Sequence, residues 1–258
     1  MLQWKSFAVD LARKSGDLLK EKFNKTHTIH YKGEINLVTE ADKLSEDLII
    51  ETISHNFLDH GILSEESPAI TGDGKLRWII DPLDGTTNYA HGYPVYCVSI
   101  ALENEGEIVL GVVNDPMREE MFVAVRGEGA FLNGKKLAVS NCDHLSKSLL
   151  ATGFPYDIRE SKENNLDYFN SMAINVQAIR RAGAAALDLA YLAAGRFDGF
   201  WELKLKPWDT AAGGLLVTEA GGVISDITGE KWNLQSPSIL ASNGLIHEQM
   251  IKVFKKTE

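Results

Sequence analysis

Apolar positions at the start of the chain recur at the spacing of an amphipathic helix. Phe7, Leu11, Leu18 and Phe23 fall on roughly one face when residues 2–23 are wound as an α-helix. A face of this kind is buried when the helix packs against a core. The pattern therefore predicts a helix over residues 2–23 that covers one side of the folded chain.

A second helix is predicted after a sequence that resembles a capping box, Thr39-Glu40-Ala41-Asp42. In a capping box the first side chain accepts a hydrogen bond from a backbone N–H of the first turn, and the acidic side chain three residues later accepts one in return. We expect this helix to continue to about Phe57. Its core-facing positions would be Leu44, Leu48 and Ile53.

The apolar run from Leu76 to Ile80 predicts a buried strand. Proline has no backbone N–H to donate to a neighbouring strand, so we expect the strand to stop at Asp81, before Pro82. A turn would follow, and its residues carry the first candidate chemistry of the chain.

That turn brings hard oxygen ligands close together. Asp81 and Asp84 are near enough in sequence for their carboxylates to converge, and the Leu83 carbonyl lies between them. Oxygen ligands without histidine or thiolate suit Mg²⁺ or Mn²⁺ rather than zinc. Gly85 lets a ligand approach the backbone, and Thr86-Thr87 resembles a helix start whose N–H groups would hold an anion. An Asp-rich turn with a threonine N-cap accounts for the same residues equally well.

Beyond Pro94 the chain is first rich in strands and then alternates between strands and helices. The strands expected in the first part cover 95–102, 107–113, 121–126 and 136–140. The second part is expected to contain strands from 149 and at 177–180, 197–203, 223–227 and 239–241, and helices at 164–174, 184–194, 208–220 and the C-terminal end. This order indicates a layered α/β sandwich. We expect one domain over residues 1–258, with loose halves at 1–145 and 146–258.

A second acidic position, Asp209, lies far downstream in the sequence Lys206-Pro207-Trp208-Asp209-Thr210. It falls at or near a helix N-terminus, where a carboxylate is favourable even without a ligand. In isolation, helix capping is the simpler explanation of this residue. Glu219, at the other end of the same predicted helix, is interpreted as a structural or solvated carboxylate.

Composition narrows the class of protein. Hydrophobic residues make up 44% of the chain and charged residues 24%, as in ordinary globular proteins. The net charge of −10 argues against a general nucleic-acid-binding protein, whose surface would be basic. It does not argue against a phosphorylated substrate, because metal ions can reverse the local field.

The cysteines and the N-terminus bear on location. Cys97 and Cys142 match no metal-binding spacing, and we expect free thiols in a reducing compartment, with a disulfide as the alternative. Lys5, Asp10 and Arg13 interrupt the N-terminal segment, which is not typical of a signal peptide. No apolar run approaches membrane-spanning length. We expect a cytoplasmic protein that does not contact membranes.

Taken together, the two acidic stretches resemble the inositol monophosphatase family. The residues that carry the resemblance are Asp81-Pro-Leu-Asp-Gly-Thr-Thr-Asn88, Trp208-Asp-Thr-Ala-Ala-Gly-Gly-Leu215, Glu219-Ala-Gly-Gly222, Leu63-Ser-Glu-Glu-Ser67 and Lys32-Gly with Leu37-Val-Thr-Glu-Ala-Asp42. Two further stretches, Ala151-Thr-Gly-Phe-Pro155 and Ala186-Leu-Asp-Leu-Ala190, are most similar to the bacterial branch. The resemblance implies an αβαβα sandwich of the type shared with fructose-bisphosphatases. It also implies Mg²⁺-dependent hydrolysis of a phosphate monoester, inhibition by lithium and a homodimer.

The resemblance assigns metal ligands residue by residue. Glu65, Asp81 and the Leu83 carbonyl would hold a first Mg²⁺ ion, and Asp81, Asp84 and Asp209 a second. Glu65 would also help to hold a weaker third ion. Mn²⁺ is a possible substitute, and Ca²⁺ and Li⁺ are expected to inhibit. Two such ions can activate a water and stabilise the leaving oxygen.

The resemblance also assigns the groups around the water and the substrate. Thr86, aligned by Asp42 and aided by Glu65, would orient the attacking water. The N–H groups of Gly85 and Thr86 would bind the phosphate, whose charge spreads in the transition state. The expected substrate contacts are Leu83, Asp84, Gly85, Thr86, Gly183, Ala184, Ala185, Glu202 and Asp209. The family usually has a hydroxyl residue where this chain has Ala184, which makes inositol a less secure choice of substrate.

Three other functions compete with inositol phosphate hydrolysis. A phosphatase with an aspartyl-phosphate intermediate would have Asp-x-Asp after the strand, whereas Pro82 and Leu83 separate the two acids here. A phosphatase of the same fold could act on fructose 1,6-bisphosphate, a 3′-phosphonucleotide, histidinol phosphate or NADP. A scaffold that binds a macromolecular partner is the third possibility, and the intact set of acids argues only against a purely vestigial site.

Overall fold

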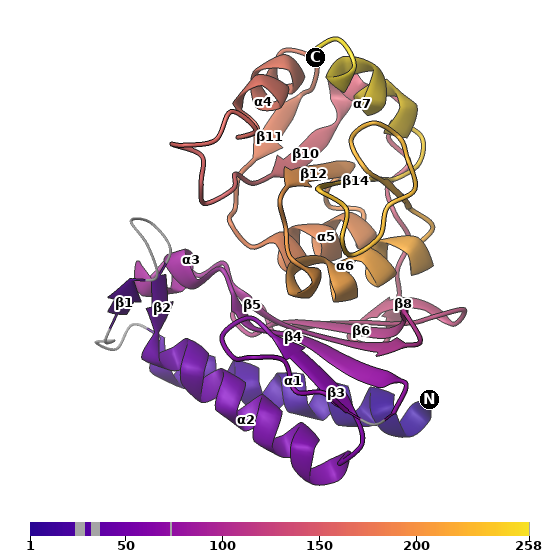
Figure 1. Ribbon diagram of the computed structural model, residues 1–258. Coiled ribbons are helices and arrows are strands. Elements are labelled where there is room, and N and C mark those ends of the chain that lie inside the picture. The colour runs from indigo at the N-terminus through magenta and orange to yellow at the C-terminus, as the bar shows by residue number, and fades with distance from the viewer. Residues whose placement is uncertain (24–28, 32–36, 73, 258) are drawn as a thin grey trace.

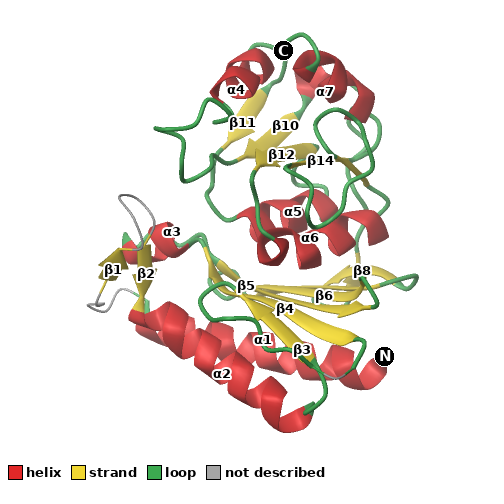
Figure 2. Ribbon diagram, in the orientation of Figure 1, coloured by secondary structure: helices red, strands yellow, loops and turns green. Residues whose placement is uncertain are grey.

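The computed structural model describes residues 1–23, 29–31, 37–72 and 74–257, and these form five stacked layers of helices and strands (Figures 1 and 2). Helices α1 (Leu2–Lys22) and α2 (Glu40–Asn56) form one outer layer. They cover one face of a seven-stranded sheet, as Figure 2 shows. Beside this layer, β1 (Ile29–Tyr31) and β2 (Leu37–Thr39) pair antiparallel.

The seven-stranded sheet has the strand order β3-β4-β5-β6-β7-β8-β9. Its strands are β3 (Gly61–Ser64), β4 (Leu76–Asp84), β5 (Cys97–Asn104), β6 (Glu107–Asp115), β7 (Glu120–Val125), β8 (Gly129–Leu132) and β9 (Lys135–Lys136). Only β3 and β4 run parallel, and the other neighbours are antiparallel. The short helix α3 (Thr86–Ala90) follows β4 directly.

The second sheet has five strands in the order β11-β10-β12-β14-β13. These are β10 (Leu149–Thr152), β11 (Ala178–Arg180), β12 (Gly199–Leu203), β13 (Val223–Ser225) and β14 (Ser238–Ser242). The outer layer on this side contains α4 (Leu166–Ala173) and α7 (His247–Phe254), which pack on the sheet around Trp201 and Leu240. A short 3₁₀ turn, η1 (Leu145–Lys147), precedes β10.

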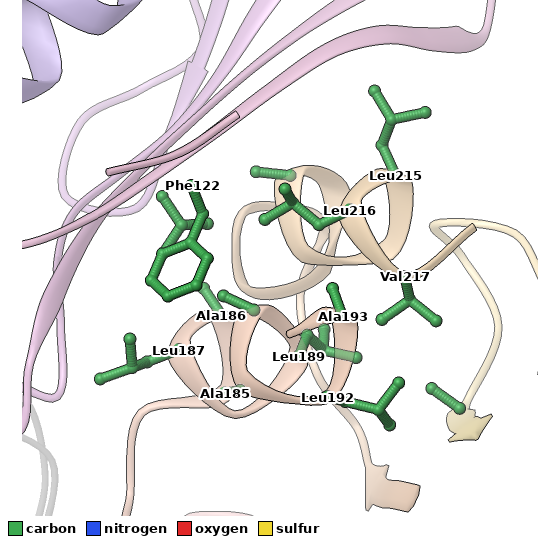
Figure 3. Packing of buried hydrophobic residues seen from close by; sticks show 14 of the residues in the cluster. Phe122, Ala185, Ala186, Leu187, Leu189, Leu192, Ala193, Leu215, Leu216 and Val217 are labelled. Atoms are coloured by element: carbon green, nitrogen blue, oxygen red, sulfur yellow. The ribbon is translucent and has the colours of Figure 1, made fainter. Parts of the chain in front are cut away.

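Helices α5 (Ala185–Ala193) and α6 (Pro207–Glu219) form the middle layer between the two sheets (Figure 1). Their side chains are apolar on several sides, because both helices are buried between sheets. In Figure 3, Phe122 of the first sheet faces α5, and Leu216 of α6 lies beside it. The middle layer is thus a single core that both sheets share. The expected αβαβα sandwich is confirmed.

Several local predictions are also confirmed. Thr39 caps α2 as expected, because the Thr39 and Asp42 side chains each accept a hydrogen bond from the backbone at the other end of the first turn. Both Cys97 and Cys142 are free thiols. No helix within the described part of the chain is long and apolar enough to span a membrane.

Three local predictions are wrong. β4 does not stop at Asp81 but continues through Pro82 to Asp84, because an irregularity in the ladder accommodates the proline. The strand expected over 136–140 is reduced to the two residues of β9. In α2, Ile53 is buried as expected, but Leu44 and Leu48 are only half-buried. The buried face of the helix includes the polar residues Asp42, Ser45 and Glu46 instead.

We propose that residues 1–258 fold as one domain, because the helices of the middle layer pack against both sheets. Two neighbouring glycines of α6 allow a test of how closely this helix packs against α5. A Cβ atom added at Gly213 would lie 2.6 Å from the Leu189 Cβ, whereas one at Gly214 would meet only ordinary contacts from 3.5 Å.

Gly213→Ala should therefore destabilise the chain by about 1–3 kcal/mol through overpacking. Gly214→Ala should be neutral or stabilise it by up to about 1 kcal/mol, because alanine favours a helix more than glycine does. Chemical denaturation measures both changes and should show a single transition. Equal effects of the two substitutions would contradict the proposed packing, and two separate transitions would contradict the single domain.

Candidate active site

An irregularity in β4 brings Asp81 and Asp84 to the same cavity. Side chains three residues apart on a regular strand point to opposite faces of the sheet. Here Asp81 lies opposite Ser99 and Asp84 opposite Cys97, so β4 advances three residues while β5 advances two. The extra residue reverses the alternation, and both carboxylates line one cavity.

Hydrogen bonds from two sides hold the irregular segment. The Ser45 hydroxyl of α2 donates to the Pro82 carbonyl at 2.7 Å. Within the segment the Leu83 N–H donates to Asp81 Oδ1 at 3.1 Å. The proline, which has no N–H for the ladder, thus contributes through its carbonyl.

Asp42 connects the start of α2 to the Thr86 hydroxyl. Its Oδ2 accepts hydrogen bonds from the Thr39 N–H at 2.8 Å and the Thr39 hydroxyl at 2.6 Å. Thr86 Oγ1 lies 2.9 Å from Asp42 Oδ1 and 3.1 Å from the Leu83 carbonyl oxygen. Burial raises the pKa of Asp42 to about 6, against hydrogen bonds from Thr39 and Thr86 that lower it.

The predicted metal ligands and Thr86 line a single cavity of about 480 Å³. The lining includes Glu65, Asp81, Leu83, Asp84, Gly85, Thr86, Glu202 and Asp209, together with Phe154, Tyr156, Lys204, Lys206 and Trp208. Asp42 reaches the cavity only through Thr86. Lys32, one of the residues that carry the family resemblance, lies outside the described residues.

Each of the two remaining acids is held by a helix N-terminus. Asp84 Oδ2 accepts from the Ala186 N–H of α5 at 2.8 Å and faces the Cys97 thiol at 3.6 Å. Asp209 lies in the first turn of α6, and its Oδ2 accepts from the Lys206 N–H at 2.6 Å. Backbone N–H groups at a helix start stabilise negative charge there.

The carboxylates nevertheless disfavour one another's ionisation. Burial raises the pKa of Asp81 well above its ordinary value, and the charges of Glu65, Asp84 and Asp209 raise it further. Burial also raises the pKa of Asp84 to about 6 and that of Asp209 to about 8. In both cases hydrogen bonds to the carboxylate oppose the shift. An excess of buried negative charge is therefore the main electrostatic property of the cavity.

The donor set fits a divalent cation of the Mg²⁺ type, since all the candidate ligands are oxygens and several are carboxylates. As the side chains stand, no three His, Cys, Asp or Glu residues of the described chain form a group that could hold a metal ion. The acids share a cavity without converging on one point. A cation would relieve the repulsion that raises the pKa of Asp81.

A smaller cavity of about 110 Å³ adjoins the first and shares Asp84, Gly85, Thr86, Glu202 and Asp209 with it. The predicted substrate contacts Gly183, Ala184 and Ala185 line this second cavity, so the structure brings both predicted groups together. The Glu202 carboxylate lies against the Gly153 backbone, where any added Cβ would clash with it. Burial raises the pKa of Glu202 to about 8.

Sequence reasoning missed the two charged residues Arg181 and Asp188 of the second cavity. Asp188 is 2% exposed, and burial raises its pKa well above the ordinary value, with the Arg181 charge opposing the shift. Its position in the apolar run Ala186-Leu-Asp-Leu-Ala190 was a usable signal, because a lone acid on a buried helix requires a reason. A separate cavity of about 370 Å³ beside α4 contains none of the predicted site residues.

A layered αβαβα fold with an acid-lined cavity at the end of β4 defines a class of phosphatase, and comparison with known proteins identifies the family. The sequence model of the inositol monophosphatase family matches residues 1–258. The chain belongs to the inositol monophosphatase family.

Relatives fall under two names. The inositol-1-monophosphatase of Mesorhizobium japonicum is 42% identical over 251 residues, which cover 96% of this chain and 94% of that protein. The Nus factor SuhB of Escherichia coli is 43% identical over 249 residues, which cover 95% and 93%. The solved inositol monophosphatase of Anabaena superposes with a TM-score of 0.91 at 41% identity, over 99% of this chain and 96% of that one. The chain is therefore similar to phosphatases and to a Nus factor alike.

The crowded carboxylates predict an unusual pH dependence of stability. A carboxyl group whose pKa is raised by folding favours the folded state in its protonated form. The contribution of these carboxyl groups to stability should therefore be greatest below the unfolded pKa of about 4 and decrease as the pH rises toward 8. The window follows from the raised pKa values of Asp84 and Asp209. Differential scanning fluorimetry of chelator-treated protein should show a melting temperature that falls from pH 5 to pH 8.

One substitution and one metal titration distinguish this effect from a general loss of stability at alkaline pH. At pH 8, Asp84→Asn should stabilise the chelator-treated protein by on the order of 2 kcal/mol, because it removes a buried like charge. Mg²⁺ at a hundredfold excess over Kd should stabilise the unsubstituted protein by about 2.7 kcal/mol. A flat pH profile, or no response to millimolar Mg²⁺, would count against a shared acidic site.

Proposed function

We propose that this chain is a Mg²⁺-dependent phosphate monoester hydrolase whose favoured substrate is myo-inositol 1-phosphate, cleaved to inositol and phosphate. The observation that supports this most directly is the single cavity lined by Glu65, Asp81, Asp84 and Asp209 next to the Thr86 hydroxyl. Family membership supports the phosphatase chemistry. The relative named inositol-1-monophosphatase supports the choice of alcohol.

In this proposal Glu65, Asp81, the Leu83 carbonyl, Asp84 and Asp209 hold two Mg²⁺ ions, and Glu65 helps to hold a third. Bound Mg²⁺ would lower the pKa of water and neutralise charge on the phosphate and on the leaving oxygen. Mn²⁺ is the expected substitute, whereas Ca²⁺ and Li⁺ are expected inhibitors. The buried acids provide the negative charge that such ions require.

Thr86 and Asp42 orient the attacking water. The Thr86 hydroxyl donates a hydrogen bond to Asp42 Oδ1, so the Thr86 oxygen is left to accept a hydrogen bond from water. That water, aided by Glu65, attacks phosphorus and gives up one proton to solvent. The bond to the ester oxygen breaks, and the departing oxygen takes up one proton from solvent to become the alcohol. The N–H groups of Gly85 and Thr86 bind the phosphate oxygens.

Glu202 and residues 183–185 recognise the alcohol half of the substrate. A buried carboxylate in the adjoining cavity can accept hydrogen bonds from a polyol. Ala184 contributes no hydroxyl, so backbone groups must supply the contact at that position. Because of this difference, fructose 1,6-bisphosphate, a 3′-phosphonucleotide, histidinol phosphate and NADP remain the rival substrates.

A second function as a macromolecular scaffold is favoured by the relatives named Nus factor SuhB. We propose that such a role, where present, uses the surface and leaves the acid-lined cavity to catalysis. We also propose that the protein is cytoplasmic, which its free cysteines support, and that it is a homodimer, which the family resemblance supports. Light scattering coupled to size exclusion measures the oligomeric state directly.

Asp84→Asn should reduce turnover by roughly a hundredfold or more. This loss exceeds the roughly 10–100-fold that is typical when a residue that only hydrogen-bonds to a metal ligand is replaced. Asparagine fits the same space but lacks the charge. The assay uses purified protein, saturating Mg²⁺ and a panel that contains inositol 1-phosphate and the rival esters. Near-normal activity of the folded variant would refute the assignment of Asp84 as a metal ligand. If the unsubstituted protein hydrolyses another ester of the panel faster than inositol 1-phosphate, that ester becomes the proposed substrate.

Thr86→Ala should lower kcat by on the order of a hundredfold and raise KM much less, because the threonine acts on the water rather than on ground-state binding. Hydrolysis in ¹⁸O-water should place the label in phosphate. Label in the alcohol would rule out attack at phosphorus. A trapped phosphoenzyme would favour the aspartyl-phosphate class instead.

Glu202→Gln should weaken hydrolysis of inositol phosphate and largely spare an aryl phosphate that has no hydroxyl groups. Because burial raises the pKa of Glu202 to about 8, the carboxyl is largely protonated at pH 7, and loss of its hydrogen bond should cost about 0.5–1.5 kcal/mol in kcat/KM. An equal loss on both substrates would assign Glu202 to support of the metal site. No loss on either would leave Glu202 without a role in recognition.

A further inference from the structure

Helix α2 carries a buried glutamate that the proposed mechanism does not use. Glu46 is 3% exposed and lies one turn beyond Asp42, on the same face of the helix. Asp42 is explained by its contact with Thr86. A buried carboxylate is costly unless hydrogen bonds satisfy it, so the partners of Glu46 indicate its purpose.

Within the described part of the chain, the hydrogen-bond donors to Glu46 lie in the short segment that contains Glu65. Oε1 accepts from the Ser64 hydroxyl and from the Glu66 N–H at 3.1 Å, and Oε2 accepts from the Ser67 hydroxyl at 2.6 Å. The donors therefore flank Glu65 on both sides. Both oxygens of one carboxylate are used to fasten four consecutive residues.

Beyond Ser64 this segment lies outside the regular secondary structure. β3 ends at Ser64, and residues 65–67 are bends outside the sheet ladder. Glu65 lines the cavity with Asp81, and its charge contributes to the raised pKa of that residue. The place of the Glu65 carboxylate thus depends on a loop whose backbone is fixed by a side chain from α2.

We propose that Glu46 is a positioning residue that holds the Glu65 loop against the cavity. The inference rests on the proposed function, because Glu65 is a metal ligand only in that function. Glu46 does not touch substrate or metal and acts through Ser64, Glu66 and Ser67. Together with Ser45, which holds Pro82, and Asp42, which holds Thr86, it makes one face of α2 the common support of three separate parts of the site.

The test compares Glu46→Gln with a matched substitution far from the cavity. Glu103 is also buried and accepts a hydrogen bond from Arg77 Nε at 2.8 Å, at the opposite end of β4 from Asp84. Glu46→Gln should raise the Mg²⁺ concentration for half-maximal activity about 10–100-fold, as expected when a group that orients a ligand is lost. Glu103→Gln should lower the melting temperature and leave that Mg²⁺ concentration within about twofold of the unsubstituted value.

A second readout does not depend on activity. The Ca²⁺ concentration that gives half of the maximal thermal shift in chelator-treated protein should rise for Glu46→Gln and stay constant for Glu103→Gln. If both variants lose stability and neither changes its response to Mg²⁺ or Ca²⁺, Glu46 is only structural and the inference fails. Absence of Mg²⁺-dependent activity in the unsubstituted protein would refute the proposed function instead, and the Ca²⁺ shift would still decide the role of Glu46.

A milder substitution covers the case in which Glu46→Gln does not fold. Ser67→Ala removes one of the hydrogen bonds and leaves the buried carboxylate two others. It should raise the half-maximal Mg²⁺ and Ca²⁺ concentrations severalfold, less than the loss of Glu46 itself. Unchanged midpoints in a folded Ser67→Ala protein would overturn the positioning role.

Discussion

Hydrogen bonds from helix N-termini to buried carboxylates are the interaction on which the cavity depends. Asp42 binds the backbone at the start of α2, Asp84 that of α5, and Asp209 that of α6. Each bond supplies positive partial charge where negative charge is crowded, and each lowers a pKa that burial raises. Without these contacts the acids would lose their charge or move to solvent. The layered fold therefore serves the site by placing several helix starts around one cavity.

The irregular turn of β4 is the second requirement, and it shows what a sequence pattern omits. Period-two alternation would place Asp81 and Asp84 on opposite faces, whereas one extra residue in the ladder places them on the same face. Sequence reasoning recognised that Pro82 is incompatible with a regular ladder. It drew the wrong consequence, because a proline can end a strand or sit in an irregularity within it. Only the pairing with β5 decides between these outcomes.

The fold class, most elements and every acid that lines the larger cavity except Asp157 could be predicted, because helix periodicity, caps and charged motifs are local signals. The roles of the residue that positions Glu65 and of two charged residues in the second cavity could not be predicted. Glu46 reads as an ordinary helix glutamate, and its partners are 18 to 21 residues away along the chain. Arg181, which follows β11, and Asp188 of α5 both line the second cavity with Glu202 and Asp84, which come from other parts of the chain. Such roles are set by tertiary contacts that no window of sequence contains.

Asp209 shows why a structural and a chemical interpretation of one residue need not compete. Its helix-capping bond uses Oδ2, and its side chain lines the cavity at the same time. Asp84 likewise uses Oδ2 for the start of α5 and lies in the same cavity. A carboxylate has two oxygens and several lone pairs, so one oxygen can fix the side chain while the other faces a ligand. The capping hydrogen bond restricts the rotation of the carboxylate side chain. A cation that binds there therefore costs less side-chain conformational entropy, because that entropy has already been lost in folding. The residues that begin the helices are for this reason well suited to hold the chemistry.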